Sequence, residues 1–435
     1  MDADAVLAAD AEHVWHPYAP VDAKPFGVVS EAQGVRLTFA DGRKAIDAMS
    51  SWWAAIHGYR HPRLDQAVTD QLDRVAHVMF GGLTHEPAVQ LATRLAGMTG
   101  LDRVFFSDSG SVSVEVALKM ALQFQRGIGH TERTRFVTIE GGYHGDTFGA
   151  MSVCDPVGGM HSMFTGVLPQ HTFLPRPPGG FDSDISAWTA ACEPLLDALN
   201  DVAAVICEPI LQGAGGMHIY PPAAVRWLAD QARSRGWLLI LDEIATGFRR
   251  LGTSDFAFQI ADVAPDILCV GKSLSAGYLS LAATLCSNTV ADGIAGSESG
   301  VLMHGPTYMA NPLACAVAIA SLDELERYNP AGTWGSIAGI LTWELEPARQ
   351  LPGVVDVRTI GTIGVIQLDR PVDVAAATNA ALDLGVWIRP FRDLIYAMPP
   401  YPIGPQDLST VCEAMVAAAR ASTGLTPAHA GRTVP

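Results

Sequence analysis

Lysine is scarce in this chain of 435 residues, where only four of the 28 basic residues are lysines. Lys24 and Lys44 lie in polar, turn-like segments, where a solvated charge is the simplest interpretation. Lys119 follows Glu115 by four residues in an expected helix, which is the spacing of an ordinary surface ion pair. Only Lys272 stands at the end of an apolar run. If the protein uses a lysine for chemistry, Lys272 is the candidate.

Excess positive charge and long apolar runs are also lacking. The net charge of −17 argues against nucleic acid or an anionic membrane as a partner, because both attract a basic surface. The longest apolar runs, such as residues 237–241, are far shorter than the roughly 20 residues of a membrane-spanning helix. The acidic start, MDADAVLAAD, does not resemble a signal peptide. We therefore expect a cytoplasmic protein without a membrane segment.

Paired cysteines are absent as well. The seven cysteines occur singly and no CxxC motif is present, so the sequence indicates reduced thiols rather than disulfides. His13 and His16 lie three residues apart without further candidate ligands, which favours capping or packing. We expect no metal site.

The middle of the chain alternates short apolar runs with helical patterns. This alternation predicts an α/β fold with a mostly parallel sheet, in which ligands bind beyond the carboxyl ends of the strands. The domains are expected at residues 51–329, a large domain, and at residues 1–50 and 330–435, which together form a smaller α/β domain. The expected strands are 104–107, 135–139, 203–208, 237–242 and 267–270, and the expected helices are 112–125, 222–235 and 312–327.

Two glycine-containing segments imitate nucleotide-binding motifs. The segment Gly271-Lys272-Ser273 could end a P-loop, but Asp266 stands where the first glycine of GxxxxGK[ST] is needed. A carboxylate beside a phosphate has the wrong sign. The segment beginning at Gly213 starts like a dinucleotide-binding fingerprint, but His218 replaces its third glycine. Both interpretations are weak.

A better anion site is the segment FFSDSGS, which leads from an expected strand into an expected helix. The backbone N–H groups of Gly110 and Ser111, the Ser111 hydroxyl and the helix dipole could all face one anion. Simple N-capping by Ser109 or Ser111 explains the segment equally well.

Asp242 and Lys272 follow two successive expected strands. A buried carboxylate requires a cationic partner, so the two could form an ion pair. Alternatively, a ligand could lie between them, with a cationic nitrogen at Asp242 and a carbonyl carbon at Lys272. Pyridoxal phosphate has both features and a phosphate in addition, and Tyr143 could stack on its ring.

Motifs along nearly the whole chain carry a family resemblance. They include SDSGSVSVEVALKMAL, GGYHGDTFGAMSVCDP, LLILDEIATGF, PDILCVGK and HGPTYMANPLACA. They resemble the class III, fold-type I aminotransferases, which implies a pyridoxal-phosphate-dependent transaminase with a large domain and a smaller domain built from both chain ends. The segments HPY, SSWW, MHGPT and WIRPF are similar to those of members that convert 8-amino-7-oxononanoate to 7,8-diaminononanoate in biotin synthesis. S-adenosylmethionine would then be the amino donor.

The resemblance also implies roles for single residues. Lys272 would bond to the cofactor covalently, Asp242 would pair with its ring nitrogen, and Tyr143 would stack on it. Gly110 and Ser111 would hold the phosphate. A segment containing Pro306 and Thr307 would reach the phosphate from a partner subunit, which implies a homodimer with shared sites. Substrate-binding positions would be Tyr18, Trp52, Tyr143, Lys272, Gly305 and Arg389.

Some residues depart from the family pattern or have a simpler explanation. Arg249 replaces a glycine and Leu251 a threonine in the usual GFGRTG, so a loop that needed a glycine with positive φ must differ here. Core packing could explain Trp52 and Trp53, and it is our interpretation of Trp53. The main alternative function is another class III ω-aminotransferase acting on 4-aminobutyrate, ornithine or a simple amine. A P-loop protein and a non-catalytic scaffold are disfavoured.

Overall fold

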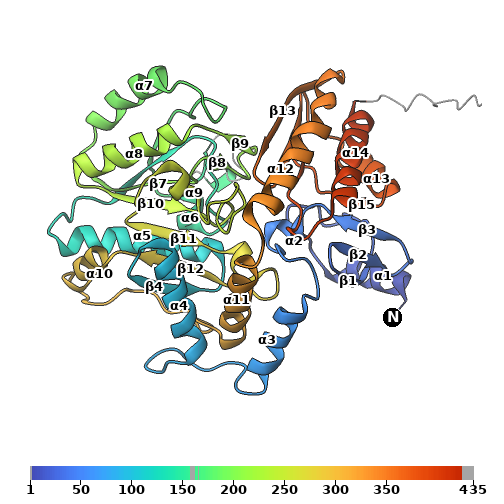
Figure 1. Cartoon of the computed structure of the whole chain (residues 1–435). Helices are drawn as coiled ribbons and strands as arrows, with labels where there is room; N and C mark the ends of the chain where they lie inside the picture. Colours follow the sequence, from blue (N-terminus) through green and yellow to red (C-terminus); the bar gives the residue numbers. More distant parts are fainter. Residues whose placement is uncertain (1, 157–161, 165, 424–435) are drawn as a thin grey trace, which may run out of the picture. The chain divides into compact units, whose positions relative to one another are not determined.

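The computed structural model describes residues 2–156, 162–164 and 166–423 (Figure 1). The chain divides into two compact units, one formed by Met1–Trp52, Ile56–Pro62 and Gly335–Pro435, the other by Trp53–Ala55 and Arg63–Trp334. The predicted combination of a large α/β unit and a smaller unit from both chain ends is confirmed.

A seven-stranded sheet forms the centre of the large unit. Its strand order is β4-β12-β11-β10-β7-β5-β6, and β12 alone runs opposite to the other strands. The predicted, mostly parallel sheet is confirmed, although β12 and β6 were not among the expected strands. The bounds are β4 (Arg103–Ser107), β5 (Arg135–Ile139), β6 (Thr172–Leu174), β7 (Val202–Cys207), β10 (Leu238–Asp242), β11 (Ile267–Val270) and β12 (Ala282–Cys286).

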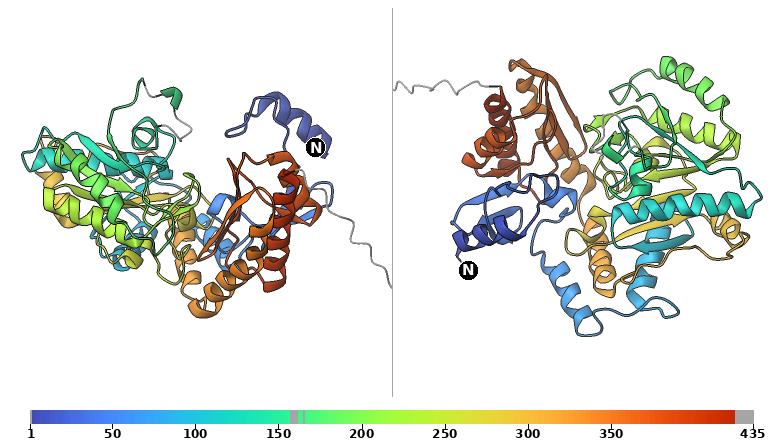
Figure 2. Two further views of the ribbon diagram at one scale, coloured as in Figure 1. Left: turned by 90° about the horizontal axis from the view of Figure 1, so that it is seen from above. Right: turned by 180° about the vertical axis from the view of Figure 1, so that it is seen from behind.

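Four central strands, β7, β10, β11 and β12, are buried along their whole length, as expected when helices cover both faces of a sheet (Figure 2). Helix α5 (Gly110–Gly127) packs on one face together with α10 (Asn288–Ala295), and α8 (Pro222–Arg235) packs on β7 and β10. The other elements are α3 (Pro62–Leu72), α4 (Glu86–Thr99), α6 (Phe148–Ser152), η1 (Ser162–Phe164), α7 (Ser186–Asp197), β8 (Leu211–Gln212), β9 (His218–Ile219), α9 (Ala257–Ala261), η2 (Lys272–Ser275) and α11 (Pro312–Leu325).

The smaller unit contains two sheets. One has the order β1-β2-β3-β15, and its parallel pair β3 and β15 joins the two ends of the chain. The other has the order β13-β14-β16. The strands are β1 (Val29–Gln33), β2 (Arg36–Phe39), β3 (Lys44–Asp47), β13 (Val354–Ile360), β14 (Ile363–Leu368), β15 (Val386–Trp387) and β16 (Leu394–Ala397). The helices are α1 (Ala3–His13), α2 (Ser50–Trp53), α12 (Pro330–Leu345, which crosses the unit boundary), η3 (Glu346–Gln350), α13 (Val374–Asp383) and α14 (Pro405–Ser422).

Among the helices in the part of the chain that the structure describes, none combines the length and the apolar character that crossing a bilayer requires.

Arg249, which stands at a glycine of the GFGRTG pattern, occupies the left-handed conformation. Its φ is 70°, so the position keeps a positive φ, and the expectation that the loop must avoid it is wrong. The guanidinium is 2.6 Å from the Asp255 carboxylate, donates to the Leu325 carbonyl at 3.1 Å and lies 5.4 Å from the centre of the Trp334 ring. These contacts offset the strain of a side chain in this region, about 1–2 kcal/mol.

We therefore expect Arg249→Gly to be more stable than Arg249→Ala by about 1 kcal/mol, although glycine is usually the less stabilising of the two. Both variants lose the side-chain contacts, but only glycine also removes the strain. Urea unfolding of the two variants measures the difference, with Asp255→Ala as the control that removes the ion pair and keeps the backbone. An alanine variant that is the more stable of the two would contradict this account.

Candidate active site

Three ionisable side chains come together at the carboxyl ends of neighbouring strands. Strands β7, β10 and β11 are adjacent and parallel, and Asp242 is the last residue of β10. Asp242 pairs with Cys269 of β11, so Lys272 emerges three residues beyond that pair. Glu208 directly follows β7 on the other side of β10. The two carboxylates and the amine therefore share one edge of the sheet.

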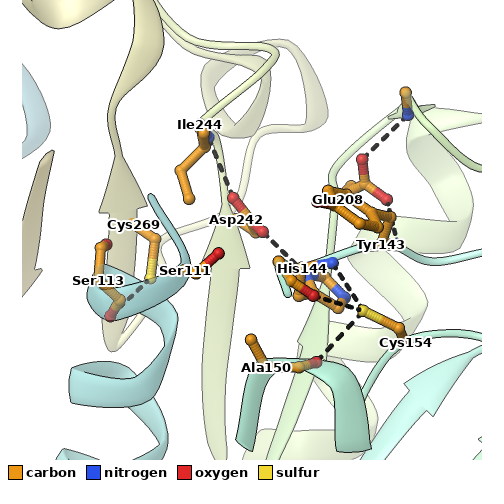
Figure 3. Close-up of polar contacts among 12 residues, drawn as sticks. Ser111, Ser113, Tyr143, His144, Ala150, Cys154, Glu208, Asp242, Ile244 and Cys269 are labelled. Atoms are coloured by element: carbon orange, nitrogen blue, oxygen red, sulfur yellow. Dashed lines mark hydrogen bonds and ion pairs between the residues drawn. The ribbon is translucent and has the colours of Figure 1, made fainter. Parts of the chain in front are cut away.

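Asp242 is held by two donors, one on each oxygen. His144 Nδ1 lies 2.8 Å from Oδ2, and the Ile244 backbone N–H donates to Oδ1 at 3.1 Å (Figure 3). The carboxylate is only 4% exposed. Burial of a charge is costly unless it is hydrogen-bonded and meets opposite charge, so this fixed carboxylate is suited to bind a cationic nitrogen.

Glu208 is a second buried carboxylate, which the sequence analysis did not single out. It accepts the backbone N–H of Tyr143 and that of Gly213, each at 2.9 Å. Desolvation raises its pKa to about 7, with His144 lowering it and Asp242 raising it to smaller extents. The Gly213 segment, which imitates a dinucleotide-binding motif, thus serves to hold this carboxylate.

The loop after β5 carries Tyr143 and His144 and is anchored at its far end. The Cys154 thiol accepts the His144 N–H at 3.1 Å and donates to the Ala150 carbonyl at 3.2 Å (Figure 3). Burial raises the pKa of this thiol to about 12, which leaves it an unreactive hydrogen-bonding group. Glu115 Oε1 accepts the N–H groups of Gly149 and Ala150 and the Thr147 hydroxyl.

This role of Glu115 corrects one expectation. Glu115 does not pair with Lys119, because its carboxylate is occupied by the loop after β5. The Lys119 amine instead contacts the Met303 carbonyl at 3.3 Å and His304 Nδ1 at 3.1 Å. The spacing of four residues placed both side chains on one helix face, but tertiary contacts on either side separate them.

Lys272 opens the short helix η2 and is half-buried, with a φ of 40°. Burial lowers the pKa of its amine, and the negative charges of Asp242, Glu208 and Asp146 offset part of that effect. A depressed pKa makes the neutral amine available for nucleophilic attack and proton transfer.

The amino end of helix α5 lies at the same edge, after β4. Ser109 caps the helix by accepting the Val112 N–H, so the capping explanation holds for Ser109. The Ser111 hydroxyl accepts the Asp146 N–H at 3.1 Å. In a helix, the N–H groups of Gly110 and Ser111 have no acceptor within the helix, which makes this end an anion site. The capping and anion-binding explanations are therefore compatible.

The first turn of α5 is fixed to the sheet by Ser113. Its hydroxyl donates to the Ala283 carbonyl on β12 at 3.1 Å, and its carbonyl accepts the Thr284 hydroxyl at 2.7 Å. The Cys269 thiol of β11 donates to the same carbonyl at 3.6 Å (Figure 3). The anion site and the strand that leads to Lys272 are thus held in fixed relation.

This edge offers a buried carboxylate, an amine of lowered pKa and a helix amino end. These are the groups that the ring nitrogen, the aldehyde and the phosphate of pyridoxal phosphate require. Comparison with known proteins agrees with that chemistry, because the model of the family described as aminotransferase class III matches residues 18–419. The chain belongs to the class III aminotransferases.

Two named relatives of this aminotransferase cover nearly its whole length. The adenosylmethionine-8-amino-7-oxononanoate aminotransferase of Mycobacterium leprae is 52% identical over 419 residues, with 94% of this chain and 95% of that protein covered. The protein of the same name from Corynebacterium glutamicum is 50% identical over 429 residues, with 97% and 100% covered.

Solved structures give the same family. The adenosylmethionine-8-amino-7-oxononanoate aminotransferase of Methanocaldococcus jannaschii has a TM-score of 0.88 at 30% identity, covering 96% of this chain and 99% of that one. An amine transaminase from an uncultivated Pseudomonas species, solved with pyridoxal phosphate bound, has a TM-score of 0.85 at 32% identity, covering 94% and 99%. This class III aminotransferase is pyridoxal-phosphate-dependent.

The remaining predicted site residues of the aminotransferase fall into two groups. Gly305 and Thr307 are exposed and Pro306 is half-buried, in a segment of the large unit after α10. The adjacent Tyr308 packs on the His77 ring with the ring centres 4.7 Å apart.

The other group belongs to the smaller unit. Tyr18 and Trp52 are both about half exposed, and their rings meet edge to face with centres 6.2 Å apart. Arg389 lies two residues beyond β15 and is half-buried. The structure thus brings together Gly110, Ser111, Tyr143, Asp242 and Lys272 within the large unit, and places Tyr18, Trp52 and Arg389 in the smaller one.

Sequence reasoning missed Glu208 and His144. Glu208 ends an expected strand just as Asp242 does, so the same rule about carboxyl ends could have identified it. His144 is adjacent to Tyr143, but its hydrogen bond joins a loop to the end of β10, 98 residues away in the chain, and no local pattern indicates it.

The raised pKa of Glu208 predicts a dependence of stability on pH. Because the folded protein binds this proton up to about pH 7 and the unfolded chain only to about 4.5, stability falls as pH rises between these values. Glu208→Gln removes this titration, so its free energy of unfolding should decline less steeply with pH, by on the order of 3 kcal/mol in total.

Unfolding by urea at several pH values, at equal cofactor occupancy, measures the slope. The glutamine also loses one accepted N–H, so the slope and not the absolute stability is the test. Glu193→Gln, at an exposed position of α7, controls for the loss of a charge. Equal slopes in wild type and Glu208→Gln would contradict the assignment.

Proposed function

We propose that this aminotransferase converts 8-amino-7-oxononanoate to 7,8-diaminononanoate in biotin biosynthesis, with S-adenosylmethionine as the amino donor. The observation that carries the proposal is identity of 50% and more, over nearly the whole chain, to relatives named for this ketone and this donor. The site chemistry described above supports transamination but does not distinguish one ketone from another.

The second candidate is another ω-aminotransferase of the family. It is favoured by the similarity to a thermostable (S)-enantioselective ω-transaminase from Thermomicrobium roseum, with a TM-score of 0.87 at 29% identity. Because that identity is far below the value for the biotin-pathway relatives, the first candidate is preferred.

We assign the cofactor contacts to side chains of the large unit. The Asp242 carboxylate would pair with the ring nitrogen and keep it protonated, while His144 fixes the carboxylate. The N–H groups of Gly110 and Ser111 and the Ser111 hydroxyl would hold the phosphate, and Tyr143 would stack on the ring. When bound, pyridoxal phosphate supplies an aldehyde that condenses with amines and a ring that accepts electrons from a neighbouring carbanion.

Lys272 has two tasks in this proposal. Its amine would hold the cofactor covalently between reactions and, once displaced by an amine substrate, would carry a proton at Nζ. The pKa lowered by burial suits both tasks, because each begins with a neutral amine.

Substrate binding is proposed for Tyr18, Trp52, Tyr143, Lys272, Gly305 and Arg389, by resemblance to the family. Arg389 is suited to the distal carboxylate of 8-amino-7-oxononanoate, since a guanidinium can bind a carboxylate through two parallel hydrogen bonds.

We further propose a homodimer in which Pro306 and Thr307 contribute to the phosphate site of the partner subunit. Exposed apolar side chains gather near this segment in the sequence, where Val301, Met303 and Tyr308 are each about 60% exposed. Contiguous exposed apolar surface is typical of protein interfaces. We place the enzyme in the cytoplasm, in keeping with seven buried, unpaired cysteines.

Borohydride reduction tests the cofactor assignment. The purified protein should be yellow, and reduction should fix the cofactor to a single peptide, the one that contains Lys272. The other three lysines serve as internal controls in the same digest. Colourless protein, or cofactor fixed to another lysine, would overturn the assignment.

A coupled assay with 8-amino-7-oxononanoate and a panel of amino donors tests the substrate. We expect turnover with S-adenosylmethionine, a KM for the ketone raised at least tenfold in Arg389→Ala, and partial recovery in Arg389→Lys. Absence of turnover of this ketone with every donor, together with turnover of 4-aminobutyrate or a simple amine, would establish the second candidate.

A further inference from the structure

The indole of Trp53 lies against the amine of Lys272. Lys272 Nζ is 4.9 Å from the centre of the Trp53 ring, within the range of a cation–π interaction. Trp53 is only 5% exposed, so packing alone could explain its burial. Packing does not explain why the ring meets the one charged atom on which the chemistry depends.

The backbone of Trp53 is tied to the residue beside that lysine. Its carbonyl accepts the Ser273 hydroxyl at 3.1 Å and an Arg250 N–H at 2.9 Å. Ser273 is the neighbour of Lys272, so ring and amine are fixed to the same short segment. Both residues also hold a positive φ, 78° for Trp53 and 40° for Lys272, and the strain indicates that the surroundings determine these positions.

Gly213 makes room for the Trp53 ring. A Cβ at this position would lie 3.2 Å from two carbons of the Trp53 indole, closer than a side chain normally packs. The same glycine donates its N–H to Glu208. The indole therefore lies against both the loop that holds the buried carboxylate and the lysine.

We propose that Trp53 is a positioning residue whose indole face binds the ammonium form of Lys272 whenever the amine is not covalently engaged. The proposal rests on the proposed role of Lys272 as the cofactor lysine. Burial disfavours the charged amine, and the ring face offsets part of this cost. The ring thus keeps a displaced, protonated Nζ at the reacting edge of the sheet.

The scarcity of lysine makes a direct test possible. With lysine labelled with ¹³C at Cε, the full-length enzyme gives only four lysine signals, and Lys272→Arg identifies the signal of Lys272. In the pyridoxamine form the amine is free, and its titration can be followed by NMR. We expect the ε-protons of Lys272 to be shifted upfield by the indole ring current, unlike those of the other lysines.

Replacing Trp53 should change both the chemical shift and the titration midpoint of Lys272, by an amount that depends on the new side chain. Trp53→Leu should abolish the upfield shift and lower the titration midpoint of Lys272 by about one pH unit. Trp53→Phe keeps an aromatic face of weaker electrostatic potential and should give intermediate values. Trp237→Phe alters an equally buried indole that faces Arg235, and should leave the Lys272 signal unchanged.

A folded Trp53→Leu protein whose Lys272 shift and midpoint equal those of wild type would overturn the proposal. If the leucine variant does not fold, Trp53→Phe decides alone, and wild-type values in that variant overturn it equally. Failure of the cofactor assignment is separate, because it would appear as borohydride labelling of another lysine while the ring-current shift persisted.

Discussion

The buried carboxylate of Asp242 is the constraint on which the site depends. It sits at the end of a strand that is buried on both faces, where an uncompensated charge would be strongly destabilising. His144 and the Ile244 N–H each occupy one of its oxygens, and a second buried carboxylate, Glu208, is close by. A site of this kind requires a cation, and in our proposal Lys272 and the cationic ring nitrogen of the cofactor would meet that requirement.

The parallel strands of the large sheet provide the geometry of the site. Strands that run in one direction deliver Glu208, Asp242 and Lys272 to the same edge, and the reversal at β12 allows β4 to end there too, with the amino end of α5 beyond it. Ser113 then joins α5 to β11 and β12, so the distance from the anion site to the lysine strand is set by hydrogen bonds within the sheet and helix layers.

The sequence predicted the features that follow from apolar runs and from the rule that ligands bind at the carboxyl ends of parallel strands. The five expected strands, Asp242, Lys272 and the turn at Gly110 follow from those two signals. It did not predict β12, because the segment AATLC combines small, polar and apolar residues and gives no clear strand pattern. It also did not predict the contacts of Lys119 and Glu115, which depend on residues distant in the sequence. Arg249 was misjudged for a physical reason: an arginine can hold a positive φ when an ion pair, a carbonyl and an aromatic ring secure its side chain.

The turn that carries Trp52 and Trp53 also holds a strained backbone through contacts with its surroundings. Ser50, Ser51, Trp52 and Trp53 all have positive φ, a left-handed turn that only glycine adopts without cost. Four glycines would relieve about 1–2 kcal/mol each, yet they would remove both indoles. Asp47 secures the turn by accepting the Met49 and Ser51 N–H groups, and Arg250 and Ser273 secure the Trp53 carbonyl. Holding the Trp53 indole against the Lys272 amine requires a turn that is strained and secured at several points. Packing of the indole in a hydrophobic core would not require such strain.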